Sequence, residues 1–256
     1  MKIAKALYYL KHPRDLQFAL AIKYPRLFSD KQFLKIFFRH LMGSELNLKC
    51  PQTNNKKLQW LKLYDHNPQY TQMVDKHEAK KYVASIIGEE YIIPTLAVYN
   101  STKEINLDVL PDKFVLKCTH DSGSVAICKD KKTFKTDEAF AMLEKGLQKN
   151  YFWQNREWPY KNVKPRIIAE AYLEDNDTQE LRDYKFFCFD GKVKALFIAG
   201  DRHKDEETKF DFFDADFNHL DIRNGHPNAN TPPAKPHSFE KMKEMAERLS
   251  QNIPHL

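Results

Sequence analysis

The sequence Phe114-Val-Leu-Lys-Cys-Thr-His-Asp-Ser-Gly-Ser-Val125 joins two short apolar runs through a polar loop that contains one glycine. The runs, at residues 114–116 and 125–128, are typical of β-strands, and Lys117 closes the first of them. This arrangement suits nucleotide phosphates, because the lysine supplies a positive charge and the loop supplies backbone N–H donors. The stretch lacks the spacing of a P-loop or a Rossmann turn, so a surface hairpin with an incidental lysine is the alternative.

Length and composition bound the class of protein. With 256 residues, of which 42% are hydrophobic and 13% aromatic, the chain has enough apolar material for one large or two modest globular domains. Every apolar run is far shorter than the ~20 residues that span a bilayer, and residues 1–10 show no secretory signal. No C-x-x-C pair or zinc-like Cys/His cluster is present, which predicts reduced thiols in a cytoplasmic protein at Cys50, Cys118, Cys128 and Cys188.

The charge is unevenly distributed. Residues 1–74 contain 13 Lys and Arg against 4 Asp and Glu, whereas the remainder contains 28 against 31. A basic segment suits nucleic acid, anionic lipid or an acidic polymer, or is simply a solvated surface. Within it, residues 31–42 read as a basic amphipathic helix, begun by Ser29 or Asp30 and ended by Gly43. We expect no nucleic-acid partner, and keep peripheral association of residues 1–42 with the inner face of the membrane as an alternative to packing on the domain.

Three segments are predicted: a basic, mainly helical segment at 1–74, an α/β or α+β domain at 75–165, and a further α+β segment at 166–256. Apolar periodicity predicts helices at 75–87, 137–150 and 238–252. Strands are predicted at 92–98, 114–117, 125–128, 166–173, 184–189, 192–198 and 210–213. The dipeptide Asp190-Gly191 predicts a two-residue type I′ turn between two of these strands.

Two patches suit the phosphates of a nucleotide. Lys76 opens a predicted helix, and Lys117 ends a strand before the loop Asp121-Ser-Gly-Ser124. Two lysines would neutralise phosphate charge that backbone N–H groups leave uncompensated. The structural alternative for each is a solvated lysine on the surface.

Two further patches suit the nucleoside. The extended segment from Glu170 to Leu173 would offer an adenine one backbone C=O and one N–H. Asp183 and Lys185 alternate on one face of a strand, where Asp183 suits ribose hydroxyls. The alternatives are an exposed strand glutamate and a same-face ion pair worth under about 1 kcal/mol.

The order of these patches resembles the ATP-grasp superfamily. The motifs are Val74-Asp75-Lys76, Lys80, Pro94, Phe114-Val-Leu-Lys117, Ser122-Gly-Ser124, Ile168-Ala-Glu170-Ala-Tyr-Leu173, Asp183-Tyr-Lys185 and Asp190-Gly191. More narrowly, Lys117-Cys-Thr-His-Asp-Ser-Gly-Ser124 and Leu181-Arg-Asp-Tyr-Lys-Phe-Phe-Cys188 resemble the TupA-like branch. That branch is named for teichuronopeptide synthesis and is found among capsule and cell-wall polysaccharide genes. The resemblance covers roughly residues 60–256.

The resemblance implies a fold of two α+β subdomains that enclose a nucleotide cleft, and an ATP- and Mg²⁺-dependent ligase. In such a ligase ATP phosphorylates a carboxylate, and an amine then attacks the acyl phosphate to form an amide. The acceptor would be a carboxylate-bearing sugar or peptide. By carry-over, Lys76 and Lys117 hold phosphates, Ser122, Gly123 and Ser124 form a lid over them, Glu170, Ala171 and Leu173 frame the adenine, Asp183 binds the ribose, and Lys185 and Arg202 face the phosphates or the acyl phosphate as catalytic residues.

One departure from the family concerns the metal. In the family, the helix that corresponds to 238–252 leads into strands that carry the acidic magnesium ligands, and these strands are expected beyond residue 256. Two other functions stay open. A glycosyltransferase that uses a nucleotide sugar would want a D-x-D motif such as Asp214-Ala-Asp216, although that pattern is more often a turn. The other alternative is a non-catalytic protein that binds a nucleotide or a polymer.

Overall fold

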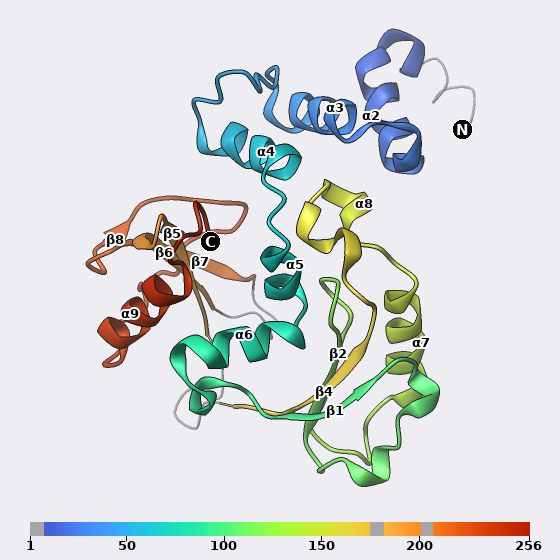
Figure 1. Ribbon diagram of the computed structural model, residues 1–256, viewed down its shortest axis with the longest axis vertical. Helices are drawn as coiled ribbons and strands as arrows, with labels where there is room; N and C mark the ends of the chain where they lie inside the picture. The colour runs from blue at the N-terminus through green and yellow to red at the C-terminus, as the bar shows by residue number, and fades with distance from the viewer. Residues whose placement is uncertain (1–7, 175–181, 201–206) are drawn as a thin grey trace. The chain divides into compact units, whose positions relative to one another are not determined.

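The computed structural model describes residues 8–174, 182–200 and 207–256 (Figure 1). The chain divides into two units, each made of two stretches of sequence. Unit 1 comprises Met1–Tyr82 and Pro94–Ala171, and unit 2 comprises Val83–Ile93 and Tyr172–Leu256. The units are therefore interleaved along the sequence. The boundaries predicted near residues 75 and 166 follow composition and motif order, and they stay a prediction.

Unit 1 contains an antiparallel four-stranded sheet with the order β1-β4-β2-β3. Its side chains alternate between two faces, and Phe114 and Leu116 join a buried apolar core with helix α7 (Thr136–Leu147). Full burial of one such side chain contributes about 1.5–3 kcal/mol. This face therefore fixes the register of β2 and leaves Lys117 on the opposite face. The strands are β1 (Thr95–Tyr99), β2 (Phe114–Cys118), β3 (Val125–Cys128) and β4 (Ile167–Ala171).

The N-terminal helices of unit 1 form a second apolar core. The predicted helix at 31–42 is confirmed as α3, and its ends are those the sequence indicates. Ser29 caps it through reciprocal hydrogen bonds with Gln32, and Gly43 ends it with a left-handed φ of 63°. Its apolar face is buried, so α3 packs on its own unit. The helices are α2 (Pro13–Lys23), the 3-10 helix η1 (Pro25–Leu27), α3 (Asp30–Met42), α4 (Asn54–Tyr64) and α5 (Gln69–Val74).

Arg156 ties these helices to the rest of unit 1. It follows the short helix α8 (Phe152–Asn155), has a left-handed φ of 55°, and is fully buried. Its Nε lies 2.7 Å from the carboxylate of Asp30 at the start of α3. The guanidinium also donates to the carbonyl of Pro25 and lies over the ring of Phe33. Because the guanidinium is fully buried, it depends on these contacts to stay paired, so Arg156 anchors the N-terminal helices although the Asp30 side chain is 42% exposed.

Unit 2 contains a second antiparallel four-stranded sheet with the order β5-β6-β7-β8. The predicted type I′ turn joins β5 to β6, with φ of 49° at Asp190 and 73° at Gly191. Helix α9 (Phe239–Leu249) buries Phe239 in a core with β6 and β7. The backbone of Leu256 pairs with that of Cys188 on β5 through two hydrogen bonds. The strands are β5 (Asp183–Phe189), β6 (Lys192–Gly200), β7 (Lys209–Asp214) and β8 (His219–Leu220).

Several predicted boundaries are wrong, each for a local reason. The predicted helix at 75–87 is a turn followed by α6 (Glu78–Ile87), because the Asp75 carboxylate accepts the N–H of His77 and so competes with the helical pattern. The predicted strand at 92–98 begins only at Thr95, after the 3-10 helix η2 (Glu89–Tyr91) and Pro94, which has no N–H. The predicted strand at 166–173 ends at residue 171, because its antiparallel partners begin there: Thr95, the first residue of β1, opposes Glu170, and Phe114, the first residue of β2, opposes Ala171.

The remaining short helices of unit 1 are η3 (Thr102–Glu104), η4 (Leu107–Val109) and η5 (Trp158–Asn162). Of the helices in the described residues, none has both the length and the apolar content of a membrane span. The cysteines are free thiols, as the sequence predicts, at Cys50, Cys118, Cys128 and Cys188.

Candidate functional site

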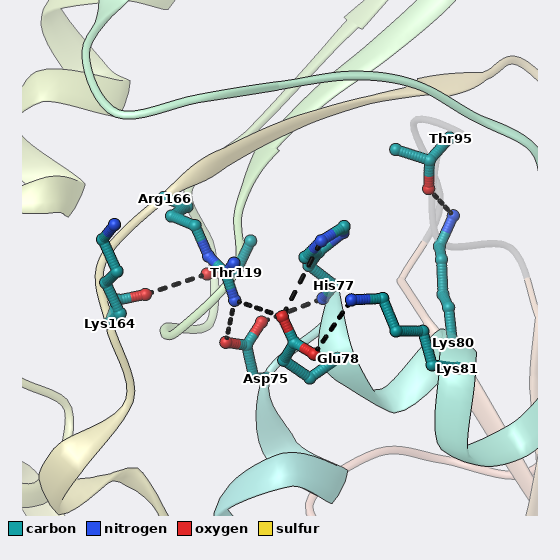
Figure 2. A network of polar contacts seen from close by, with 9 residues as sticks. All are labelled: Asp75, His77, Glu78, Lys80, Lys81, Thr95, Thr119, Lys164 and Arg166. Carbon is teal, nitrogen blue, oxygen red and sulfur yellow. Dashed lines mark hydrogen bonds and ion pairs between the residues drawn. The ribbon is translucent and has the colours of Figure 1, made fainter.

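A buried glutamate lies between two lysines on the face of the first sheet that is turned away from α7. Glu170 on β4 has 3% of its surface exposed. Its carboxylate forms an ion pair with Lys117 on β2 and another, at 2.5 Å, with Lys80 on α6. Lys80 also donates to the hydroxyl of Thr95 on β1 at 2.9 Å (Figure 2). We call Lys80, Lys117 and Glu170 the Glu170 cluster. Two lysines share one carboxylate, so the cluster has a net positive charge. The ion pairs hold both lysines in place, because a buried carboxylate must stay paired.

Lys76 contacts the loop between β2 and β3, which we call the 119–124 loop. Its ammonium group donates to the carbonyl of Cys118 at 3.0 Å and to that of Asp121. Its backbone N–H donates to the carbonyl of Thr119. Burial lowers the pKa of Lys76, and the charge of Asp121 opposes that effect. The prediction that Lys76 opens a helix is wrong, since it lies in the turn between α5 and α6. The structure places Lys76 beside the 119–124 loop, and its predicted contact with phosphates stays a prediction.

The 119–124 loop presents unused backbone donors. Within the described residues, no hydrogen bond is donated by the backbone N–H groups of residues 120–124. Ser122 and Gly123 are exposed at the loop, and Gly123 has a φ of 98° that favours glycine. Successive N–H groups without acceptors form a partly positive surface that suits an anion.

The base of the same loop is tightly packed. Ser124 is buried, and its hydroxyl donates to the carboxylate of Asp121 at 2.5 Å. His120 Nε2 lies 3.1 Å from the carbonyl of Gly146 on α7. A Cβ added at Gly146 would lie 2.5 Å from Ser124 Oγ, so α7 approaches the loop as closely as glycine allows. Burial also raises the pKa of the neighbouring Cys118 thiol to about 12. The loop therefore combines a fixed base with an exposed tip.

A second set of charges links this loop to the start of β4 (Figure 2). Arg166, directly before β4, donates to Asp75 at 2.7 Å and to Glu78 at 3.1 Å. Its own carbonyl accepts the N–H of Thr119 at 2.9 Å. Burial acts to raise the pKa of Glu78, but hydrogen bonds from Arg166 and Lys81 outweigh it and lower that pKa. We call Asp75, Glu78 and Arg166 the Arg166 network, and it fixes Lys76 from the adjacent position in the chain.

The segment predicted to frame an adenine has one occupied and one available position. Ala171 ends β4, and its N–H donates to the carbonyl of Pro94 at 3.0 Å. Leu173 lies beyond the strand and is 42% exposed. Neither its N–H nor its C=O bonds to another residue that the structure describes. A backbone contact to a base therefore stays a prediction, with Leu173 better suited to it than Ala171.

The predicted residues of unit 2 are arranged differently. Asp183 and Lys185 lie on one face of β5, as their spacing predicts, and form an ion pair at 3.4 Å. The predicted catalytic residue Arg202 lies outside the described residues. Asp214 of the D-x-D motif accepts the N–H groups of Asp216 and Asn218, so this carboxylate is occupied by its own turn. The motif gives no support to a metal-dependent sugar transfer.

The chemistry of the described side chains fits a polyphosphate better than a metal ion. Lysines and unused N–H groups lie together on unit 1, and they are the donors that phosphate oxygens accept from. Across residues 8–174, 182–200 and 207–256, by contrast, no three His, Cys, Asp or Glu side chains are grouped to hold a metal. A set of magnesium ligands is therefore not identified in this part of the chain.

Sequence reasoning from single residues missed several of these contacts. Lys80 enters the sequence argument only through the family motif, although its spacing of four positions from Lys76 suggests one helix face. Arg166 and Asp75 lie 91 positions apart in the chain, so no local pattern indicates their pairing. Gly146 reads as an ordinary helix residue until its contact with the loop is known.

Comparison with known protein families gives one match. The family described as TupA-like ATPgrasp matches residues 56–256, which is most of the chain. Searches of curated proteins and of solved structures found no match. The matched range includes the Glu170 cluster, the 119–124 loop and the Arg166 network.

Proposed function

The chain belongs to the TupA-like ATP-grasp family, and on this premise we propose that it binds ATP at the Glu170 cluster and the 119–124 loop. We further propose that it uses the ATP to join an amine to a carboxylate. ATP-grasp proteins bind nucleotides, and generally ATP with Mg²⁺. The residues that would hold the phosphates here are Lys117, Lys80 and the N–H groups of the loop.

The observation that supports the proposal is a combination of two features on unit 1: lysines held in place by ion pairs, and backbone N–H groups that have no acceptor among the described residues. Glu170 holds both lysines of its cluster before any ligand arrives. The loop that follows Lys117 has N–H groups without acceptors, and Lys76 grips the carbonyls of that loop. Fixed charges and dipoles lower the barrier to phosphoryl transfer because they need no rearrangement when charge develops.

The proposed reaction has two steps. The γ-phosphoryl group of ATP passes to a carboxylate oxygen of the acceptor, which forms an acyl phosphate as the bond to ADP breaks. An amine then attacks the acyl carbon, the C–N bond forms, inorganic phosphate leaves with the C–O electron pair, and the amine loses a proton. Lys117 and Lys80 would balance charge on the transferring phosphoryl oxygens, and the loop would exclude water from the acyl phosphate.

The roles of residues in unit 2 and the biological setting are part of the proposal. Asp183 would bind the ribose, and Lys185 and Arg202 would face the phosphates or the acyl phosphate, as the family resemblance implies. The acceptor would be a carboxylate-bearing sugar or peptide of capsule or cell-surface polysaccharide synthesis. Exposed positions for Asp183 and Lys185 are compatible with contact to a ligand.

Calorimetry with ATP tests the nucleotide site. We expect ATP to bind and the Lys117→Met substitution to weaken binding about tenfold or more, because a charge-assisted contact is lost. Lys132→Met is the matched control, since Lys132 is exposed shortly after β3 and its side chain forms no hydrogen bond or ion pair with a described residue. Equal affinities for both variants, or no binding of ATP to the natural chain, would contradict the site.

Turnover separates a ligase from a binding protein. Incubation with ATP, Mg²⁺, a uronic acid or peptide acceptor and an amino acid should release ADP and phosphate in equal amounts. Binding of ATP without release of either product would favour the non-catalytic alternative. Preferential binding of a uridine diphosphate sugar would favour the glycosyltransferase.

A further inference from the structure

Helix α2 has two apolar sides, of which only one is covered. Ala21 is fully buried, and Phe18 packs beside it in the core that α2 forms with α3. Leu16, Leu20 and Lys23 lie on the opposite side of the helix, since their spacing places them about two turns along one face. Leu16 and Leu20 are exposed in the structure. An amphipathic helix with one buried face would ordinarily carry polar residues here.

The exposed apolar side continues beyond the helix. Lys23, Tyr24, Pro25, Arg26 and Leu27 line an open pocket of about 370 Å³ at the junction of α2 and η1. Leu27 is 79% exposed, which is as high as any large apolar residue in the described chain. We call Leu16, Leu20 and residues 23–27 the α2 surface. Aliphatic side chains and two cations thus share one short surface.

The charge around this surface is mainly positive. Residues 8–42 contain seven Lys and Arg against two Asp and Glu. Both acids have partners on their own unit: Asp15 accepts a hydrogen bond from Tyr8, and Asp30 pairs with Arg156. The ammonium of Lys23 and the guanidinium of Arg26 face only aromatic rings within the described residues. Within the described residues, no acidic side chain therefore pairs with the two cations of this surface.

We propose that the α2 surface docks on an anionic phospholipid bilayer. A bilayer can bind both the cations and the exposed leucines of this surface. Acidic headgroups attract the cations, and the leucine side chains enter the membrane interface. A soluble acidic polymer would use the cations and gain nothing from Leu20 and Leu27. Helix α3, for which the sequence left a membrane surface as the alternative to packing on its own domain, buries its apolar face. This proposal is independent of the nucleotide site.

Vesicle co-sedimentation of the full chain tests the surface. We expect binding to vesicles of phosphatidylcholine mixed with phosphatidylglycerol, weak binding to phosphatidylcholine alone, and weaker binding in high salt. Two double variants, Lys23→Glu with Arg26→Glu and Leu20→Ser with Leu27→Ser, should each weaken binding about tenfold or more. Circular dichroism and the urea unfolding midpoint report whether each variant keeps its fold.

The chain offers a matched control. Val109 is 73% exposed in the 3-10 helix η4, much as Leu27 is in η1, and Lys103 is an exposed lysine close to it in the sequence. Val109→Ser with Lys103→Glu should leave vesicle binding unchanged. The proposal is overturned if vesicles are not bound, or if the control weakens binding as much as the α2 variants. It is equally overturned if the leucine variant binds normally while soluble polyglutamate competes, which would indicate an acidic polymer.

Discussion

Glu170 on β4 lies buried between Lys117 and Lys80, whereas Asp183 on β5 pairs with Lys185 where both side chains reach solvent. Only 4% of the Glu170 side chain is exposed, against 38% for Asp183 and 53% for Lys185. The two sheets therefore carry the same kinds of charged residues in different surroundings. An exposed pair contributes under about 1 kcal/mol, while a buried charge that loses its partner costs several times more.

This difference in burial predicts two different behaviours toward a ligand. The lysines of the first sheet are already oriented, so a phosphate that binds there meets fixed charges and needs little reordering of side chains. The pair on the second sheet can open at small cost and turn to a ligand.

The largest expected effect is on stability at Glu170. Glu170→Gln should lower the free energy of unfolding by about 2–4 kcal/mol, because two partly buried lysines lose their shared anion. Asp183→Asn should lower it by less than about 1 kcal/mol. Urea unfolding of the two variants beside the natural chain measures both values.

Double-mutant cycles make this test independent of the substitution chosen. The coupling between Glu170→Gln and Lys117→Met should exceed about 1 kcal/mol, and that between Asp183→Asn and Lys185→Met should be close to zero. Similar coupling energies on both sheets would show that burial does not distinguish the two pairs.

The next effect concerns the packing under the 119–124 loop. Gly146→Ala should destabilise unit 1 by about 1–3 kcal/mol, since the new Cβ would lie 2.5 Å from Ser124 Oγ and 2.8 Å from Cys118 Sγ. Both atoms are held, by Asp121 and by the carbonyl of Leu143. Thermal unfolding measures the change.

Helix propensity alone predicts the opposite sign. Alanine is favoured over glycine inside a helix by about 1 kcal/mol. Ala141→Gly, at an exposed position of the same helix α7, measures that preference without a steric contact. If Gly146→Ala stabilises the protein by as much as Ala141→Gly destabilises it, the loop is loosely packed and its base is not fixed.

The sequence was sufficient for features that depend on neighbouring residues. Ser29 and Gly43 mark the ends of α3 by capping chemistry, and Asp190-Gly191 specifies its turn by backbone freedom. The apolar run at 114–116 was enough to predict the strand, and within a strand Leu116 and Lys117 lie on opposite faces because side chains repeat every two residues. The family resemblance supplied the overall class of fold, which the match to residues 56–256 supports.

The sequence was insufficient where the decisive contact is distant. The turn at Lys76 depends on Asp75, whose carboxylate is held by Arg166 91 positions away. The pairing of Lys117 with Glu170 depends on β2 lying beside β4, and that of Lys80 depends on where α6 packs, and no local pattern contains either. Tertiary contacts of this kind override the periodicity that predicted one continuous helix at 75–87.

A smaller effect distinguishes the Arg166 network from a surface ion pair. Arg166→Lys keeps the charge but removes the planar group that reaches both Asp75 and Glu78, and it should cost about 1 kcal/mol. In unit 2, Lys192 pairs with Glu247 at 3.1 Å but is 65% exposed. Lys192→Met should change the free energy of unfolding by less than about 0.5 kcal/mol in urea. Equal losses would mean that Arg166 contributes only as a surface charge.

The smallest expected effect is a dependence of stability on pH that comes from His77 in unit 1 and His255 in unit 2. Added salt should change the pKa of the first histidine and leave that of the second nearly unchanged. Burial, and next the charge of Arg166, lower the pKa of His77, whereas burial alone lowers that of His255. A histidine in the unfolded chain has a pKa of about 6.5. As the pH falls, the unfolded chain therefore binds a proton at each histidine before the folded chain does. This contribution to stability is therefore fully present above about pH 6.5 and is lost as the pH falls through the folded pKa of each histidine.

Nuclear magnetic resonance of the imidazole carbons separates the two causes. Added salt should raise the pKa of His77, because it screens Arg166 and Lys81, which together outweigh the opposing charges of Glu78 and Asp75. It should leave the pKa of His255 nearly unchanged, since desolvation does not depend on ionic strength. Equal salt responses at the two histidines would show that the charges of Arg166 and Lys81 do not lower the pKa of His77, and that burial alone accounts for both shifts.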